Sequence, residues 1–85
     1  MNVNLLFFAS FKEQLDCGRL DFELTEGTTV AGLCEQLATK GGNWQSLFSA
    51  ASQSVKVSVN QEMADMQTPL QANDEVAFFP PVTGG

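Results

Sequence analysis

The part of this sequence with the clearest chemical potential is its end, where Gly84 and Gly85 close the chain. A carboxylate acylates nothing at neutral pH until one of its oxygens becomes a leaving group, and adenylation by ATP achieves this by forming an acyl-phosphate anhydride. Attack by a persulfide or sulfide sulfur then leaves a thiocarboxylate, whose sulfur is nucleophilic at neutral pH. Because each step has to occur inside another protein, the reacting carboxylate of Gly85 requires a slim carrier.

The residues before the two glycines predict such a carrier. Pro80 and Pro81 lack a backbone N–H and fix φ, so neither a helix nor a central strand continues beyond Phe79. Residues 80–85 should then form an extended arm of about 20 Å. Its tip has no side chains and fits a narrow channel. Frayed ends are common, but a Gly-Gly end has a chance of about 0.7% at this glycine content, and a frayed end needs no rigid base.

The rest of the chain offers no competing catalytic group. The sequence contains no histidine, no phosphate-binding loop and no nucleophile elbow. Gly41-Gly42 lacks the lysine and the spacing of a phosphate loop, and we interpret it as the end of a helix with Lys40 in its last turn. Asp21 and Glu23 alternate with apolar residues, which places them on a solvated strand face rather than in an acid–base pair. The body of the chain is therefore predicted not to be an enzyme.

Composition narrows the class of partner. The net charge is −6, with ten acids against four basic residues, Lys12, Arg19, Lys40 and Lys56. Four scattered cations do not make the basic footprint that nucleic-acid binding requires, so no nucleic-acid partner is expected. An acidic surface suits a basic protein partner, but the same charge also serves solubility alone.

Cysteines and apolar runs indicate the compartment. Cys17 and Cys34, without histidine, cannot supply the four ligands of structural zinc, so no metal site is expected, and two cysteines do not form a secreted disulfide framework. Cys34 is predicted in the core and Cys17 in a turn. The early apolar run at residues 5–9 is too short for a signal peptide, and no run approaches a membrane span. The chain is therefore predicted to be cytoplasmic, with no membrane contact.

Hydrophobic periodicity predicts the elements that position the tail. Residues 19–24 alternate polar and apolar, and Thr28 or Thr29 can cap a helix whose apolar stripe runs from Val30 to Ala38. A helical turn is expected within residues 10–17, and a second, shorter helix within residues 44–51. The expected strands are residues 2–8, 19–24, 55–59, 63–64 (a short edge strand) and 75–79.

This order predicts an α+β fold. Two opening strands, a crossover helix and closing strands form a β-grasp, the ubiquitin-like arrangement, with a mixed sheet of four to five strands and one main helix across it. One domain is expected over residues 1–79, followed by a flexible, extended tail over residues 80–85. Phe7 is expected in the core, whereas docking and core are equally compatible with the position of Phe79 beside the tail.

Several stretches carry a family resemblance. Residues 74–85 (DEVAFFPPVTGG) are similar to the signature of the small, sulfur-carrier subunit of molybdopterin synthase. Residues 3–13 (VNLLFFASFKE) resemble the opening strand and loop of that family, residues 29–37 its helix, and residues 59–61 its third strand and turn. The resemblance covers nearly the whole chain, although Lys12 stands where an arginine is common.

The resemblance implies a cycle with three partner systems. An E1-like adenylyltransferase would activate Gly85 with ATP, and a sulfur donor system would convert the glycyl adenylate to a thiocarboxylate (1-thioglycine). The large subunit of molybdopterin synthase would then receive the tail and supply the catalytic side chains. There the sulfur would pass to cyclic pyranopterin monophosphate, in a heterotetramer of two small and two large subunits. The small subunit itself would bind no cofactor.

The resemblance and the expected exposure together name the contact residues. Gly85 is the reacting position, and Gly84 would lie with it in the partner's channel. The expected groove contacts are Phe79, Pro80, Pro81, Val82 and Thr83, with Lys12 as a further partner contact and Phe7 or Phe8 as an extension of the apolar base.

Three other functions fit the same kind of fold and end. A sulfur carrier for thiamine synthesis or tRNA thiolation would share the Gly-Gly end but use another acceptor. A ubiquitin-like protein modifier would form isopeptides with lysines. A passive interaction domain would carry no chemistry at its end.

Overall fold

The computed structural model describes residues 1–49 and 55–80 and confirms the α+β prediction. The expected position of Ala51 in the second helix, and the tail after Pro80, lie outside the described residues. The elements in chain order are β1 (Asn2–Phe7), α1 (Ala9–Leu15), β2 (Arg19–Glu23), α2 (Val30–Ala38), α3 (Gly42–Phe48), β3 (Lys56–Val59), β4 (Glu62–Ala64) and β5 (Glu75–Phe79).

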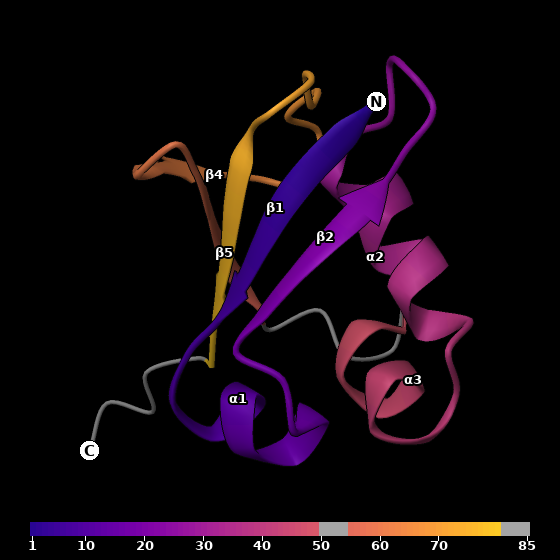
Figure 1. The fold of residues 1–85 in the computed structure, drawn as a ribbon, viewed down its shortest axis with the longest axis vertical. Helices are drawn as coiled ribbons and strands as arrows, with labels where there is room; N and C mark the ends of the chain where they lie inside the picture. The colour runs from indigo at the N-terminus through magenta and orange to yellow at the C-terminus, as the bar shows by residue number, and fades with distance from the viewer. Residues whose placement is uncertain (50–54, 81–85) are drawn as a thin grey trace.

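The strands form one mixed sheet in the order β2-β1-β5-β3-β4 (Figure 1). β1 and β2 pair antiparallel, and β4 is the predicted short edge strand. β5 lies in the centre, parallel to β1 and antiparallel to β3. The strand that leads into the tail therefore has hydrogen-bonded neighbours on both sides.

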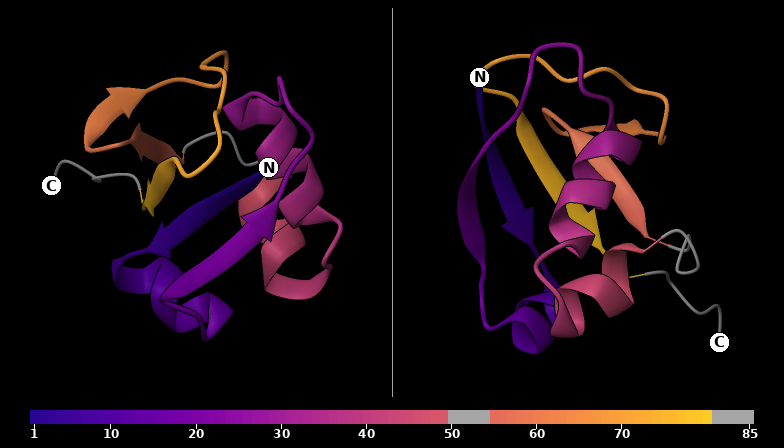
Figure 2. Two further views of the ribbon diagram at one scale, coloured as in Figure 1. Left: turned by 45° about the horizontal axis from the view of Figure 1, so that its top comes forward. Right: turned by 90° about the vertical axis from the view of Figure 1, so that its right-hand side faces the viewer.

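The helices cover one face of the sheet, with α2 crossing it and α3 near one end (Figure 2). Alternate residues of β1 and β5 point into this layer, and Val3, Leu5, Val76 and Phe78 are fully buried. The stripe predicted on α2 is buried at Val30, Leu33, Cys34 and Leu37. The core also contains the two residues that α1 contributes, Phe11 and Leu15.

Local capping explains where α2 begins. Thr29 is extended (φ −90°, ψ 173°), and its hydroxyl oxygen accepts a hydrogen bond from the Gly32 N–H at 3.3 Å, as an N-cap residue does. The neighbouring loop fixes the same end, because the N–H groups of Val30 and Ala31 donate to the carbonyls of Thr68 and Met66. The N–H groups of the first helical turn have no partner within the helix, and here they donate hydrogen bonds to the Thr29 cap and to the loop before β5.

The end of α2 differs from the prediction. The helix ends at Ala38 with Thr39 as C-cap, so Lys40 lies beyond the last turn and Gly41-Gly42 opens α3 instead. The turn tightens, since the Lys40 N–H bonds the Leu37 carbonyl, and Gly41 then takes φ 78°, a conformation that favours glycine. The Lys40 Nζ lies 5.2 Å from the centre of the Trp44 ring, where it makes a cation–π contact rather than a dipole contact.

Cys34 is buried as predicted, and this has a measurable consequence. Burial raises the pKa of its thiol from 9.0 to about 11. As the pH rises past 9, the unfolded chain releases this proton first and the folded chain keeps it. The contribution of Cys34 to stability is thus fully present below pH 9 and is lost between pH 9 and 11.

We expect the free energy of unfolding to fall by at most about 2–3 kcal/mol over that range because of Cys34. Urea unfolding at pH 8, 9, 10 and 11 measures it, with Cys34→Ala as the control that lacks the thiol. The chain has no tyrosine, so lysines, Cys17 and the N-terminus give a background common to both proteins. Parallel pH profiles for the two proteins would contradict the expectation.

Candidate partner-docking site at the base of the tail

Three of the predicted contact residues lie within the described part of the chain. Phe79 is the last residue of β5 and is half-buried, Pro80 follows it and is also half-buried, and Lys12 is exposed on α1. The others, Pro81, Val82, Thr83, Gly84 and Gly85, lie outside the described residues. The described part of the site is therefore the base of the tail, where the chain leaves the sheet at Phe79 and Pro80.

Two aromatic pairs anchor that point, one on each face of the sheet. Phe7 and Phe78 are register partners on the core face, with ring centres 5.7 Å apart and planes at 12°. Phe8 and Phe79 stack on the opposite face at 5.0 Å and 5°. The Phe8 N–H donates to the Phe78 carbonyl at 3.3 Å, which extends the β1–β5 ladder by one residue. Each stacked pair contributes about 0.5–1.5 kcal/mol beyond its burial.

The core pair is braced by α3. The Trp44 and Phe48 rings lie 5.4 and 6.2 Å from Phe7, and Phe48 also lies 5.0 Å from Phe78. Phe7 and Phe78 are 2% and 0% exposed. The prediction that Phe7 belongs to the core is confirmed, and the last buried ring before the tail, Phe78, is held by ring neighbours from two other elements, β1 and α3.

The outer face, opposite α2, carries an apolar surface that continues from Phe79. Leu6 of β1 pairs with Ala77, Ala77 with Ser58, and Ser58 with Met63 of β4, which places these residues on one line across four strands. Phe8 and Met63 are 42% and 70% exposed. We call the residues that form this surface the outer-face patch: Leu6, Phe8, Met63 and Phe79.

Met63 was missed as a contact candidate from the sequence, whereas Ala77 is only 5% exposed and lies beneath this surface. The signal for the patch was the apolar run at the ends of β1 and β5, where Leu6, Phe8 and Phe79 are apolar although they face away from the core. A sheet face that meets only water usually carries polar residues at these positions. An apolar outer face next to the tail is what a docking surface requires.

Lys12 lies at the same end of the sheet, on the helix that follows β1. Its aliphatic stem packs over Gly18, where an added Cβ would come within 3.1 Å of the Lys12 Cε. The backbone supports this contact, because the Cys17 N–H donates to the Lys12 carbonyl at 3.1 Å. The stem is thus held against the start of β2 while the ammonium group is free to meet a partner.

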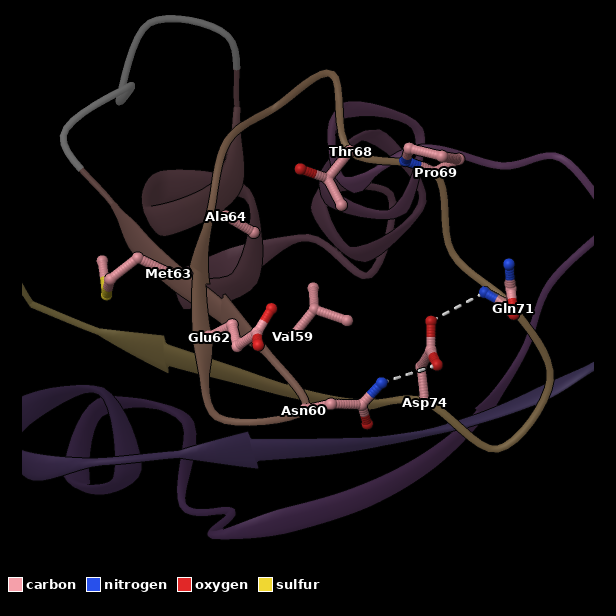
Figure 3. A pocket seen from close by; sticks show the side chains of 9 residues that line it. All are labelled: Val59, Asn60, Glu62, Met63, Ala64, Thr68, Pro69, Gln71 and Asp74. Carbon is pink, nitrogen blue, oxygen red and sulfur yellow. Dashed lines mark hydrogen bonds between the residues drawn. The ribbon is translucent and has the colours of Figure 1, made fainter.

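A pocket of about 400 Å³ lies at the other end of β5, between the β3–β4 hairpin and the loop before β5 (Figure 3). Its central carboxylate, Asp74, accepts hydrogen bonds from the Asn60 side chain at 2.9 Å and the Gln71 N–H at 2.7 Å. Asn60 in turn accepts from the Glu75 N–H at 3.0 Å. These bonds tie the hairpin to the start of β5 and give the carboxylate a structural role.

The described residues contain neither a metal-ligand cluster nor a membrane-spanning helix. No cluster of three or more histidine, cysteine or carboxylate side chains could hold a metal ion there. None of the helices in residues 1–49 and 55–80 has the length and apolar character to cross a bilayer.

Comparison with curated proteins gives three relatives that match this chain from end to end. Each is a molybdopterin synthase sulfur carrier subunit. The proteins from Mycobacterium tuberculosis, Haemophilus influenzae and Escherichia coli are 37%, 34% and 32% identical, over 100%, 98% and 98% of this chain and 99% of each relative.

Solved structures share the fold. SAMP1 from Haloferax volcanii superposes with a TM-score of 0.80 over the full length of both chains at 24% identity. A chain in the complex of subunits 1 and 2 of the molybdopterin-converting factor from Helicobacter pylori gives a TM-score of 0.67, again over both full lengths, at 22% identity. The β-grasp arrangement predicted from the order of elements is thereby confirmed.

A match to one protein family also covers nearly the whole chain. Residues 5–85 match the ThiS family, a range that includes the second half of β1, the central strand β5 and the closing glycines. A match of this extent, together with relatives above 30% identity along the whole chain, establishes the family. The chain belongs to the ThiS family and is similar throughout its length to the sulfur carrier subunits of molybdopterin synthase.

Proposed function

We propose that this chain is the sulfur carrier of molybdenum cofactor biosynthesis and that the Gly85 carboxylate is its working group. The observation that carries the proposal is the end-to-end match to three molybdopterin synthase sulfur carrier subunits, together with a family match that extends through Gly85. The anchored base at Phe78 and Phe79 supports it, because a carrier needs a rigid point from which its tail can reach into a partner.

The proposed chemistry takes place on the tail in two steps. A Gly85 carboxylate oxygen attacks the α-phosphorus of ATP in the activating enzyme, forming the glycyl adenylate and releasing pyrophosphate. Sulfide from the donor system then attacks the acyl carbon and releases AMP and a proton, which leaves the thiocarboxylate. The thiocarboxylate sulfur is delivered to cyclic pyranopterin monophosphate inside molybdopterin synthase. The chain's own contribution is to dock and to present the reacting atom.

The proposed partners are a large subunit of molybdopterin synthase, an E1-like adenylyltransferase and a sulfur donor, all in the cytoplasm. The Helicobacter pylori structure, which holds subunits 1 and 2 of the molybdopterin-converting factor together, supports the first of these. The outer-face patch and the half-buried Pro80 form the proposed docking surface, with Pro81, Val82 and Thr83 continuing into the partner groove and Gly84 and Gly85 entering the channel. Aromatic anchors of this kind carry much of the energy at protein interfaces.

Intact mass spectrometry tests the proposal. After incubation with ATP, the cognate activating enzyme and a sulfur source, the chain is expected to gain about 16 Da, because one oxygen of the Gly85 carboxylate is replaced by sulfur. Adding the large subunit and cyclic pyranopterin monophosphate should return the mass to its starting value. Reactions without ATP or without sulfide are the controls.

The same measurement separates the other functions. A conjugate with a lysine-containing protein would identify a modifier, and an unchanged mass would identify a passive domain. A gain in mass that the large subunit cannot discharge would identify a carrier for thiamine synthesis or tRNA thiolation. Each of these three outcomes would overturn the proposed function.

A further inference from the structure

Three of the four basic residues, although far apart in the sequence, lie at the end of the sheet where the tail leaves. Lys56 is the register partner of Phe79, and Arg19 is the register partner of Leu6 near the end of β1. Lys12 lies on α1, which begins directly after β1 (Figure 1). Lys40 lies instead on the helix layer, with its Nζ 5.2 Å from the centre of the Trp44 ring and 6.0 Å from that of Phe22, the register partner of Val3. We call Lys12, Arg19 and Lys56 the basic rim.

The other half of the sheet is acidic. Glu23 pairs with Asn2, and both Asp21 and Glu75 pair with Asn4, in the half of β1 away from the tail. Glu62 pairs with Val59 at the far end of β3, and Asp74 lies directly before β5. No residue of the basic rim lies in this half of the sheet. At the tail end, α1 contributes two acids, Glu13 and Asp16.

The rim is free to meet a partner. Lys12, Arg19 and Lys56 are exposed, and among the described residues none of them has a carboxylate within ion-pair distance. Net charge alone suggested a basic partner, but a partner that receives the tail meets the basic rim and not the acidic half. The partner surface is therefore expected to be acidic where docking occurs, and not basic as the net charge alone suggested.

We propose that the basic rim docks against acidic side chains around the mouth of the partner channel that receives the tail. The proposal rests on the proposed function and identifies the partner surface as a ring of carboxylates on a protein. A chain with one basic and one acidic end has a dipole that turns the tail toward such a mouth. Charge complementarity of this kind raises association rates by 10-fold to 1,000-fold at low salt and changes dissociation much less.

A phosphate ligand is a poorer match for the rim. Phosphate is bound by clustered basic groups, often a bidentate arginine or a helix N-terminus. The rim residues instead come from three separate segments and lie beside an apolar base made by Phe8 and Phe79. An apolar centre with charged residues at its border is the usual layout of a protein–protein interface.

The test is the rate of association with the purified large subunit of the cognate molybdopterin synthase, without nucleotide, measured by stopped flow from 20 to 500 mM NaCl. For the unaltered chain the rate is expected to fall about 10-fold or more across this range. In the double variant R19Q/K56Q the low-salt rate should fall about 10-fold and lose most of its salt dependence, with less than about a 3-fold change in the dissociation rate.

The matched control is Q61E/Q71E, which changes the net charge by the same amount at the acidic end. Both glutamines are exposed, and both substitutions keep the shape of the side chain. The proposal predicts an association rate within about 2-fold of the unaltered chain for this control. Equal effects of the two double variants would overturn it, as would a rate that rises in R19Q/K56Q or a rate that does not depend on salt.

These outcomes are distinct from failure of the proposed function. If the chain gains sulfur and discharges it with the large subunit, yet the two double variants associate alike, only the basic rim is refuted. If the chain neither gains sulfur nor binds the large subunit, the proposed function and the rim fall together. Circular dichroism of both variants shows that the fold is retained.

Discussion

Deletion of Gly85 is expected to abolish sulfur transfer and to leave the free energy of unfolding within about 0.5 kcal/mol of the unaltered chain. The reacting carboxylate would move to Gly84, one residue short of its position in the partner, and a displacement of that size removes the alignment on which transfer depends. The core described here closes at Phe78, well before the deleted residue. Sulfur delivered to cyclic pyranopterin monophosphate in a single turnover, and urea unfolding, measure the two effects.

Substitutions that keep the length of the tail distinguish the effect of tail length from the effect of side-chain size. Gly84→Trp should block transfer as fully as the deletion if the channel admits only residues without side chains, whereas Gly84→Ala should lower transfer much less. If the deletion variant still delivered sulfur, or if it unfolded at lower urea, the tail would not be the pendent carrier that we propose.

Replacement of Phe78 by alanine is expected to lower the free energy of unfolding by about 3–5 kcal/mol. The ring is 0% exposed and contacts the rings of Phe7 and Phe48 from two other elements. A loss of this size is a large part of the total free energy of unfolding, which is roughly 4–13 kcal/mol for a domain of this length. Urea unfolding monitored by the fluorescence of Trp44, which packs in the same cluster, measures it.

Phe79→Ala is the matched control, since it removes the same ring from the next position of the same strand. Phe79 is half-buried on the outer face and stacks on one ring only, so a loss of about 1–2 kcal/mol is expected. Its larger effect should appear in affinity for the large subunit, because it lies in the outer-face patch. Equal losses of stability in the two variants would show that both faces of β5 are core.

The strands and the main helix could be predicted because local signals and tertiary packing agree there. Residues 19–24 alternate strictly and form β2, and the cap oxygen expected at Thr28 or Thr29 is supplied by Thr29. The end of α2 was predicted wrongly because a glycine pair signals both a helix end and a turn between helices. Only the position of Trp44 on the next helix, which draws Lys40 onto its ring, distinguishes the two.

Features that depend on strand order could not be read from the chain. Leu6, Ala77 and Met63 lie on one line across the outer face because β5 lies between β1 and β3. No local sequence pattern specifies which strands are neighbours in the sheet. The gathering of Lys12, Arg19 and Lys56 at one end has the same origin. For the tail, the prediction for Gly85 stays a prediction, since residues 81–85 lie outside the described part.

The central position of β5 also determines how the carrier withstands mechanical load. A pull on the tail acts along β5, which is held by four register pairs to β1 on one side and four to β3 on the other. Hydrogen bonds that cross the direction of pull carry the load together in shear, whereas bonds at a peeled edge break one after another. A partner can therefore grip this protein by its tail, and release or extract it, without unravelling the domain behind it.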